Sequence, residues 1–334
     1  MQEIEEYGRA YGEYTVNTVY FGGGTPTLLD AKDLTRILYA VKNSFAVSDD
    51  AEITTECNPA TAEIEYFKQL RLAGFNRLSI GAQSMNEREL KLLGRLHSAE
   101  DTKKAFLDAR KAGFENISAD IMFGIPEQTS ESLEKTLDAI CALSPNHISL
   151  YGLKIEDGTH FARRIDSLVL PDEDTEYEMY VSSVKKLSDF GLNRYEISNF
   201  ATDGFESRHN LKYWLREDYL GMGAAAHSCI GDRRFFNTCD MAEYCNGNRL
   251  SGEETISKHD ILCEKIMLGM RLREGVNFKE LQNACGESTA KYQKAFEKYI
   301  SSGHAKETNG RISFSNDGMY VSNRILSEIL DFEK

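Results

Sequence analysis

The sequence predicts an α/β protein: a partial βα barrel followed by a small helical, winged-helix-like domain. Runs of β-branched and apolar residues alternate with helical patterns through residues 1–205, as in a parallel sheet with helical crossovers. A short motif also occurs at Ala73 and Ala112 and, more loosely, at Phe190, in which a helix ends at a glycine and a strand follows. Such repeated junctions are typical of a barrel or partial barrel, where ligands bind at the carboxyl ends of the strands.

The barrel elements can be assigned in chain order. Val16–Phe21 is expected to form a buried strand, and Asp30 is expected to cap the helix that follows. The apolar face of that helix carries Leu34, Ile37, Leu38 and Val41. Further strands are predicted at Glu52–Glu56, Arg77–Gly81, Asn116–Phe123, His147–Leu153 and Arg194–Ser198. Further helices are predicted at Ala62–Ala73, Glu87–Leu93, Glu100–Ala112 and Ser130–Leu143.

The tail has a different pattern. Helices are predicted at Ile261–Leu272, Phe278–Ala284, Ser288–Ser301 and Tyr320–Leu330. Between the last two, His304–Glu307 and Arg311–Ser315 flank Asn309-Gly310, a strong signal for a two-residue hairpin. Three helices and a hairpin resemble a winged-helix unit. We therefore expect a barrel domain at 1–205, a connector at 206–255 and the winged-helix-like domain at 256–334.

Composition excludes several classes of protein. The net charge is −14, and an acidic chain repels phosphate backbones and anionic lipid, so no nucleic-acid partner is expected. Residues 256–334 carry +1 and the preceding residues −15, which supports a boundary near residue 255. We recognise no signal peptide and no run able to span a bilayer, and the seven scattered cysteines lack metal-knuckle spacing. Reduced thiols in a cytoplasmic protein are therefore expected.

Candidate ligand groups stand near the predicted strand ends. Tyr20–Thr27 contains three successive glycines, whose backbone can approach a ligand closely, but it has neither dinucleotide nor phosphate-loop spacing. Successive units then supply a carboxylate, a carboxamide, a guanidinium and a second carboxylate: Glu56, Gln83, Arg95 and Asp120. Polar groups inside parallel strands are costly to bury unless bonded, so four of them indicate a shared small-molecule site.

These segments together resemble the radical S-adenosylmethionine (SAM) family of oxygen-independent coproporphyrinogen oxidases. The resemblance rests on Tyr20–Thr27, Glu56–Pro59, Arg77–Ser84, Gly94–His97 and Asp120–Thr129. It implies a partial six-stranded βα barrel that binds SAM. It implies that Gly23, Gly24 and Thr25 contact the methionine part of SAM, and that Glu56, Gln83, Arg95 and Asp120 bind the rest. The chemistry agrees, because an ammonium needs carboxylate acceptors and a carboxylate is well matched by arginine.

A further segment, His209-Asn210-Leu211-Lys212-Tyr213-Trp214, resembles the signature of the heme-chaperone branch of this family. That branch is thought to bind heme and pass it to acceptor proteins, so the resemblance implies heme as a ligand. His209 is a candidate axial iron ligand, with Tyr213 and Trp214 packing on the porphyrin. His227 is a second, weaker candidate. The acceptor is left open, with a membrane-associated protein among the candidates, and so is the oligomeric state.

The chain departs from the family at its start. Members carry Cys-x-x-x-Cys-x-x-Cys before the first glycine-rich strand, and these thiolates hold a [4Fe–4S] cluster. This chain begins at Met1-Gln2-Glu3, inside what should be the first helix, and no other cysteine triplet replaces that motif. We therefore expect a truncated barrel that lacks its first strand, has no metal ligands for the cluster, and cannot generate the deoxyadenosyl radical.

Two alternatives to heme chaperoning remain. The SAM-site motifs allow oxidative decarboxylation of coproporphyrinogen III, which requires the missing cluster segment. The tail allows a nucleic-acid-binding regulator, because Lys291, Lys294 and Lys298 form a basic stripe on one predicted helix. A solvated helix face explains those lysines better, given the acidic body of the chain.

Overall fold

The computed structural model describes residues 1–159 and 161–332, which form two compact units. The barrel unit comprises Met1–Arg194 and Ser198–Ser207, and the C-terminal unit comprises Tyr195–Ile197 and Arg208–Lys334. The three-part division at residues 205 and 255 stays a prediction.

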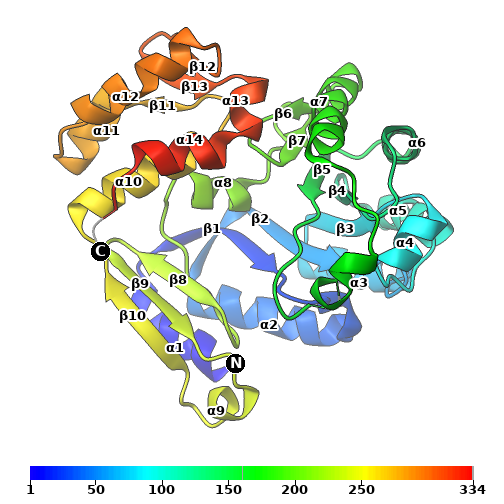
Figure 1. Cartoon of the computed structure of the whole chain (residues 1–334). Coiled ribbons are helices and arrows are strands. Elements are labelled where there is room, and N and C mark those ends of the chain that lie inside the picture. The colour runs from blue at the N-terminus through cyan, green and yellow to red at the C-terminus, as the bar shows by residue number, and fades with distance from the viewer. Residues whose placement is uncertain (160, 333–334) are drawn as a thin grey trace. The chain divides into compact units, whose positions relative to one another are not determined.

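A curled seven-stranded sheet forms the centre of the barrel unit, in the order β1-β2-β3-β4-β5-β7-β6 (Figure 1). The strands are β1 (Thr15–Phe21), β2 (Ala46–Cys57), β3 (Arg77–Gln83), β4 (Asn116–Phe123), β5 (His147–Gly152), β6 (Asn193–Arg194) and β7 (Asn199–Ala201). The first five are parallel, as the strand–helix alternation predicted. The predicted α/β half-barrel is therefore confirmed.

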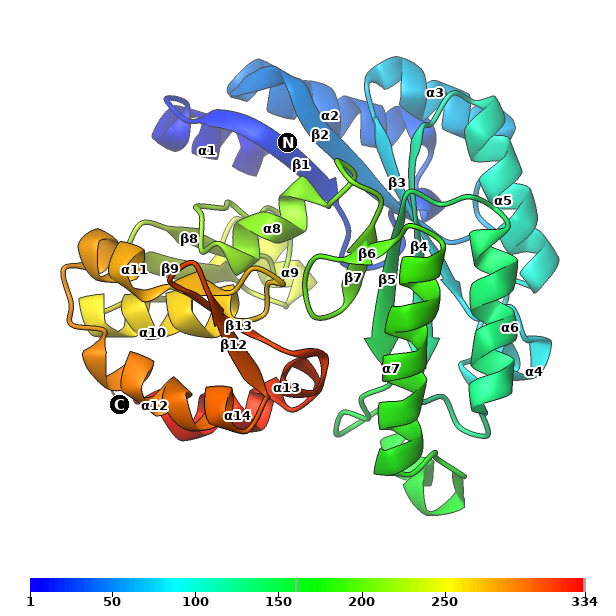
Figure 2. The same cartoon turned by 90° about the horizontal axis from the view of Figure 1, so that it is seen from above.

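Helices cover the outer face of this sheet (Figure 2). They are α1 (Gln2–Tyr11), α2 (Ala31–Ser44), α3 (Ile64–Ala73), α4 (Glu87–Leu92), α5 (Ala99–Lys111), α6 (Ser130–Cys141) and α7 (Glu173–Asp189), with short 3-10 turns η1 (Pro26–Leu28) and η2 (Ala162–Ser167). Asp30 precedes α2 as predicted, but its side chain makes no capping bond and pairs with Lys32 instead. Leu34, Leu38 and Val41 are buried beneath that helix.

The repeated junction motif has a conformational cause. Gly74, Gly113 and Gly191 all adopt positive φ, at 108°, 93° and 78°. In each copy the apolar residue after the glycine donates its N–H to a carbonyl of the last helical turn, for example Phe75 to Leu70 at 3.1 Å. This is the Schellman ending of a helix, which turns the chain back toward the sheet. The glycines identified in the sequence are therefore required by backbone geometry.

The strand expected at Arg194–Ser198 is wrong. Only Asn193 and Arg194 join the sheet there, and the chain then returns as β7, antiparallel to β5. The backbone of Tyr195–Ile197 bonds within the C-terminal unit instead: Tyr195 accepts from the Arg273 N–H at 2.9 Å, and Glu196 forms a bridge with Leu272. Backbone groups already bonded in this way cannot also extend a strand.

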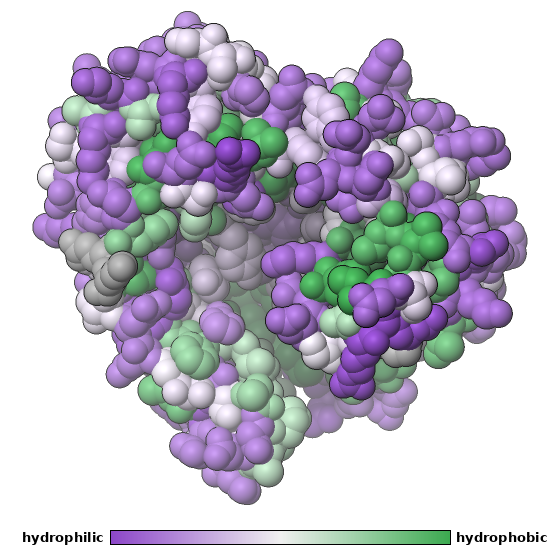
Figure 3. Space-filling view, in the orientation of Figure 1, coloured by the Kyte–Doolittle hydropathy of each residue, from purple (hydrophilic) through white to green (hydrophobic). Residues whose placement is uncertain are grey.

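The loop between β5 and α7 carries η2 and exposes apolar side chains. Ile165, Val169 and Leu170 are 48%, 69% and 37% exposed. Figure 3 shows the resulting apolar surface over this loop. In the part of the chain that the structure describes, no helix combines the length and apolarity needed to cross a membrane.

The C-terminal unit contains two small sheets. An antiparallel sheet, β10-β9-β8, which the sequence analysis did not predict, is built from β8 (His227–Ile230), β9 (Arg233–Asn237) and β10 (Leu250–Thr255). The second sheet has the order β11-β13-β12 and consists of β11 (Val276–Asn277), β12 (Ala305–Thr308) and β13 (Arg311–Phe314). The predicted turn between β12 and β13 is present, with positive φ at Asn309 and Gly310.

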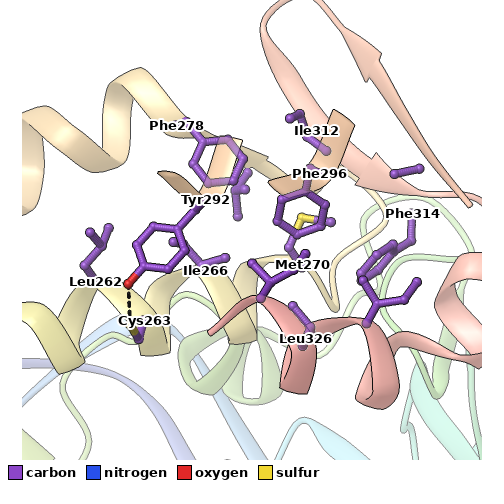
Figure 4. Close-up of a cluster of buried hydrophobic side chains, with 14 of the residues drawn as sticks. Leu262, Cys263, Ile266, Met270, Phe278, Tyr292, Phe296, Ile312, Phe314 and Leu326 are labelled. Carbon is purple, nitrogen blue, oxygen red and sulfur yellow. Dashed lines mark hydrogen bonds between the residues drawn. The ribbon is translucent and has the colours of Figure 1, made fainter. Parts of the chain in front are cut away.

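The helices of this unit are α8 (Arg208–Trp214), α9 (Met241–Cys245), α10 (Lys258–Gly269), α11 (Phe278–Cys285), α12 (Ala290–Ser301), α13 (Asn316–Tyr320) and α14 (Ser322–Ile329). The predicted last helix, Tyr320–Leu330, is present as α14, and the short helix α13 before it was not predicted. α10, α12 and α14 pack with the β11–β13 sheet around one apolar core, whose centre includes Ile266, Phe296 and Leu326 (Figure 4).

Candidate functional site

Most of the residues predicted to bind SAM line one cavity. The cavity lies in the barrel unit and measures about 300 Å³. It is lined by the loop after β1, by residues of β2 through β5, and by the segment after α4. Its lining includes Gly24, Thr25, Glu56, Gln83, Arg95 and Asp120. Of the set predicted for SAM, only Gly23 is outside the lining. Residues separated by up to a hundred positions thus converge, as expected for a parallel barrel.

The glycine-rich loop after β1 is shaped by its contact with Glu56. A Cβ on Gly22 would lie 2.7 Å from Glu56 Oε1 and 2.6 Å from the Tyr20 ring, so a larger residue would displace both side chains. Gly23 has φ of 86°, and its backbone N–H donates to the Glu56 carboxylate. Gly23 therefore acts on the cavity through Glu56, and Gly22 is a required residue that the sequence analysis did not single out.

Glu56, at the end of β2, is positioned by its neighbours as a hydrogen-bond acceptor. The Tyr20 hydroxyl donates to its Oε1 at 2.8 Å. Burial raises the pKa of Glu56, the bonds from Tyr20 and Gly23 oppose that shift, and the charge of Asp120 adds to it. A partly desolvated carboxylate with fixed donors on one side can accept an ammonium group on the other.

Gln83 ends β3 in an unusual backbone conformation. Its φ is 62°, and the Ser84 N–H donates to the Ala82 carbonyl at 2.7 Å, so the chain makes a tight three-residue turn. A Cβ on Gly81 would lie only 3.0 Å from the Gln83 carboxamide nitrogen. The carboxamide therefore occupies space that the missing side chain of Gly81 leaves open. Strained turns of this kind concentrate at functional sites.

Arg95 reaches the cavity because α4 ends in a Schellman turn. Gly94 has φ of 67°, and the Arg95 N–H donates to the Leu90 carbonyl at 2.9 Å. Two residues on, buried His97 bonds to the Ala82 carbonyl through Nε2 at 3.1 Å, which fastens the loop beside Gln83. In the segment Gly94–His97, the glycine ends the helix, Arg95 places a cation at the cavity, and His97 anchors the loop. The sequence analysis did not predict this role of His97.

Asp120 lies within β4, is partly buried and lines the cavity. Ser79 Oγ lies 3.0 Å and 3.1 Å from its two carboxylate oxygens. Burial raises the pKa of Asp120, while bonds from Ser149 and Ser79 and the nearby Arg77 charge lower it. Arg77 is almost completely buried, at 2% exposure. Asp120 therefore combines acceptor oxygens with a rigid position on the cavity wall.

The donor set of this cavity fits an amino-acid nucleoside such as SAM. The cavity is lined by a carboxylate that can accept an ammonium group and by a guanidinium that can pair with a carboxylate. It is also lined by a carboxamide and a second carboxylate, which can bond ribose hydroxyls. The cysteines do not fit an iron–sulfur cluster. Cys57 lines the cavity, but among the described residues no second thiol joins it there.

His209, the candidate heme ligand, lies on α8 in the C-terminal unit. Its Nε2 is 3.0 Å from the Tyr213 hydroxyl, and the two rings meet edge to face at 5.2 Å. Tyr213 in turn meets Tyr219 at 4.7 Å. No residue of α8 is buried. His227 stands on β8, stacked on Phe236 with ring centroids 5.1 Å apart.

Comparison with known proteins shows two family matches. Residues 1–140 match the radical SAM superfamily, and residues 256–321 match the HemN C-terminal domain. Heme chaperone HemW of Bacillus subtilis is 36% identical over 306 residues, covering 86% of this chain and 81% of that protein. Heme chaperone HemW of Lactococcus lactis is 33% identical, covering 98% and 88%. Coproporphyrinogen III oxidase (HemN) from Escherichia coli has a similar fold, with a TM-score of 0.85 at 23% identity, over 98% of this chain and 80% of that one.

Proposed function

This chain belongs to the heme chaperone HemW family of radical SAM proteins, and on that premise we propose that it binds heme and transfers it to acceptor proteins. The observation that carries the proposal is the amphipathic surface around α8. Tyr213 and Leu215 are 40% and 47% exposed, and His209 stands in contact with Tyr213. A porphyrin supplies a flat apolar face for such aromatic groups and an iron for the imidazole.

The contact with Tyr213 prepares His209 for iron. Burial raises the pKa of Tyr213, with a further contribution from Tyr219, so its hydroxyl keeps its proton. When that hydroxyl donates to Nε2, the imidazole nitrogen carries a lone pair, which is the form that ligates a metal. Heme binding through Nε2 then requires only that Tyr213 turn aside. His227 is kept as a second candidate ligand, because it stands exposed beside an aromatic ring.

Heme binding is tested by titrating the purified chain with hemin. Hemin bound to the parent should give a Soret band. In His209→Ala the apparent affinity for hemin should fall at least tenfold, because an axial ligand is lost. His304→Ala is the matched control, since His304 lies in the same unit and its imidazole contacts its neighbour Ser302 at 2.9 Å. An unchanged titration in His209→Ala would remove His209 from the proposal, and loss in His227→Ala instead would transfer the role.

We further propose that the barrel cavity binds SAM. In this assignment Glu56 accepts the α-ammonium, Arg95 pairs with the carboxylate, and Gln83 and Asp120 bond the ribose. Bound SAM would supply a sulfonium to this cavity. The cysteines present do not fit a cluster, so this chain's residues support neither a radical step nor oxidative decarboxylation. Nucleic-acid binding likewise has less support than heme transfer.

SAM binding can be measured by calorimetry on the purified chain. Glu56→Gln should weaken SAM binding by tenfold or more, because a charge-assisted bond becomes a neutral one. Glu63→Gln, at the exposed start of α3, is the matched control and should bind as the parent does. Equal affinity in all three proteins would contradict the assignment of Glu56.

The acceptor of the heme is a separate part of the proposal. The apolar loop surface at Ile165, Val169 and Leu170 and the exposed aromatic groups of α8 are both available for transient contacts. Heme transfer is followed spectroscopically, as loss of the Soret band of the loaded chain when an apo-hemoprotein is added.

A further inference from the structure

A histidine, a cysteine and an aspartate meet in the C-terminal unit at a place that neither proposed site uses. His259 and Cys263 lie four residues apart on α10 and therefore on one face of the helix. Asp331 follows α14. One ligand atom from each residue lies within 4.8 Å of the other two. These are three different metal-ligating groups, contributed by segments about seventy residues apart.

The separations of these atoms resemble those of a tetrahedral metal site. His259 Nε2 lies 3.7 Å from Cys263 Sγ and 3.6 Å from Asp331 Oδ1. Zinc bonds to nitrogen, sulfur and oxygen at tetrahedral angles require about 3.6 Å between nitrogen and sulfur and about 3.4 Å between nitrogen and oxygen. For these two pairs of atoms, the observed separations therefore lie within a few tenths of an ångström of those that zinc requires.

The surroundings hold these groups in place and leave a side open. Cys263 is completely buried, whereas the side chains of His259 and Asp331 are 22% and 60% exposed, so a cation and a water molecule can enter from solvent. Tyr292 links the other two ligands: its hydroxyl lies 3.1 Å from Cys263 Sγ and donates to Asp331 Oδ1 at 2.6 Å (Figure 4 shows the first contact). Lys291 pairs with Asp331 Oδ2 at 2.7 Å, leaving Oδ1 toward the histidine.

We propose that His259, Cys263 and Asp331 bind a borderline-soft divalent cation, best matched by Zn²⁺, with water in the fourth position. Imidazole, thiolate and carboxylate are all ligands that zinc accepts, and three protein ligands leave one coordination position open. The cation fastens the segment after α14 to the first turn of α10, and so stabilises the C-terminal unit. Without metal, the same segment is held by the bonds from Tyr292, Lys291 and His259 alone.

Binding must displace a proton. Burial raises the pKa of the Cys263 thiol, with smaller opposing effects from Tyr292 and the Asp331 backbone. The thiol is therefore protonated at neutral pH, and the bound metal takes the place of that proton.

The probe for this site is Co²⁺, added to the 334-residue chain in which exposed Cys239 and Cys245 are replaced by serine. One equivalent should produce a thiolate-to-cobalt charge-transfer band together with the strong visible bands of four-coordinate cobalt. Cys263→Ala should abolish the charge-transfer band, and His259→Asn should weaken cobalt binding at least tenfold. Absence of the band in the parent, or its persistence in Cys263→Ala, would overturn the proposal.

Two matched variants and a second measurement distinguish the loss of a metal ligand from a general effect on folding. Cys285→Ala and His304→Asn change a thiol and an imidazole elsewhere in the same unit and should keep the cobalt spectrum. Zn²⁺ should raise the thermal midpoint of the parent but not of His259→Asn, in which a partly exposed side chain is replaced without opening the core. A parent midpoint unaffected by Zn²⁺ would show that hydrogen bonds alone fasten this segment.

Discussion

At the scale of single residues, two side chains of the barrel cavity lower the stability of the folded chain. Gln83 holds a positive φ that a non-glycine residue adopts at a cost. Asp120 is a carboxyl group within the sheet, and desolvation raises its pKa. Such groups persist where the surrounding packing is strong, and they are then positioned before a ligand arrives. Both residues fit the interpretation that this cavity is a binding site.

Replacing Asp120 by asparagine should show how much the desolvated charge of Asp120 destabilises the folded chain. The folded-state pKa of Asp120 lies above its ordinary value of 3.8, so the folded chain holds this proton more tightly than the unfolded chain does. The contribution of Asp120 to stability is therefore present at low pH and is lost as pH rises from about 4 through the folded-state pKa. An asparagine side chain cannot ionise, so the Asp120→Asn variant should be more stable than the parent at pH 7.

Urea unfolding of the two proteins at pH 4.5 and pH 7 measures this difference. The advantage of Asp120→Asn should be larger at pH 7 than at pH 4.5. A variant less stable by the same amount at both pH values would show that the bonds from Ser79 and Ser149 outweigh burial of the charge.

At the scale of elements, glycines decide where strands can pair. Gly275 precedes β11 with φ of 64°, and a Cβ there would lie 1.9 Å from the Ile312 carbonyl oxygen of β13. Gly303 precedes β12 with φ of 81° but has open space around it. The two glycines therefore share a backbone requirement and differ in packing. Only the first permits two segments to approach closely.

Gly275→Ala and Gly303→Ala separate these two effects. Gly303→Ala should destabilise the chain by about 1 kcal/mol, the cost of a left-handed alanine. Gly275→Ala should cost at least ~2 kcal/mol more, because the new methyl group forces β11 and β13 apart. The free energy of unfolding in urea measures both, and similar values would show that β11 adapts to the added methyl group without loss.

At the scale of the whole molecule, charge separates the candidate functions. The chain carries −14 overall. Two lysines of the predicted basic stripe are also neutralised locally, since Lys291 pairs with Asp331 at 2.7 Å and Lys298 with Glu328 at 3.0 Å. Paired lysines on an acidic chain are poor ligands for phosphate. The winged-helix-like arrangement of the tail therefore does not indicate a nucleic-acid function by itself.

Duplex DNA should accordingly show no specific binding. Fluorescence anisotropy of a labelled duplex should stay flat up to micromolar protein at about 150 mM salt, because the net field is repulsive. Binding that strengthened steeply as salt was lowered, and that was lost in Lys294→Glu, would restore the regulator hypothesis.

Much of the candidate cavity could be predicted from sequence because parallel strands share a direction. Residues in the carboxyl-terminal halves of neighbouring parallel strands then lie toward one end of the sheet, and Glu56, Gln83 and Asp120 line one cavity there. The junction glycines were visible for a similar reason, because a helix that turns back into a strand needs a left-handed residue at Gly74 and Gly113. These rules are local, so the order of residues is sufficient to apply them.

Only the tertiary structure decided the remaining features, because they depend on contacts between distant segments. The failure of Arg194–Ser198 to form a strand follows from bonds to Leu272 and Arg273, which no local pattern records. The hydrogen bond from Tyr20 to Glu56 connects β1 and β2, and it depends on the register in which these strands pair. The meeting of His259 and Cys263 with Asp331 requires α10 and the end of α14 to pack together. In each case the partner is selected by packing in three dimensions, and its distance along the chain carries no signal.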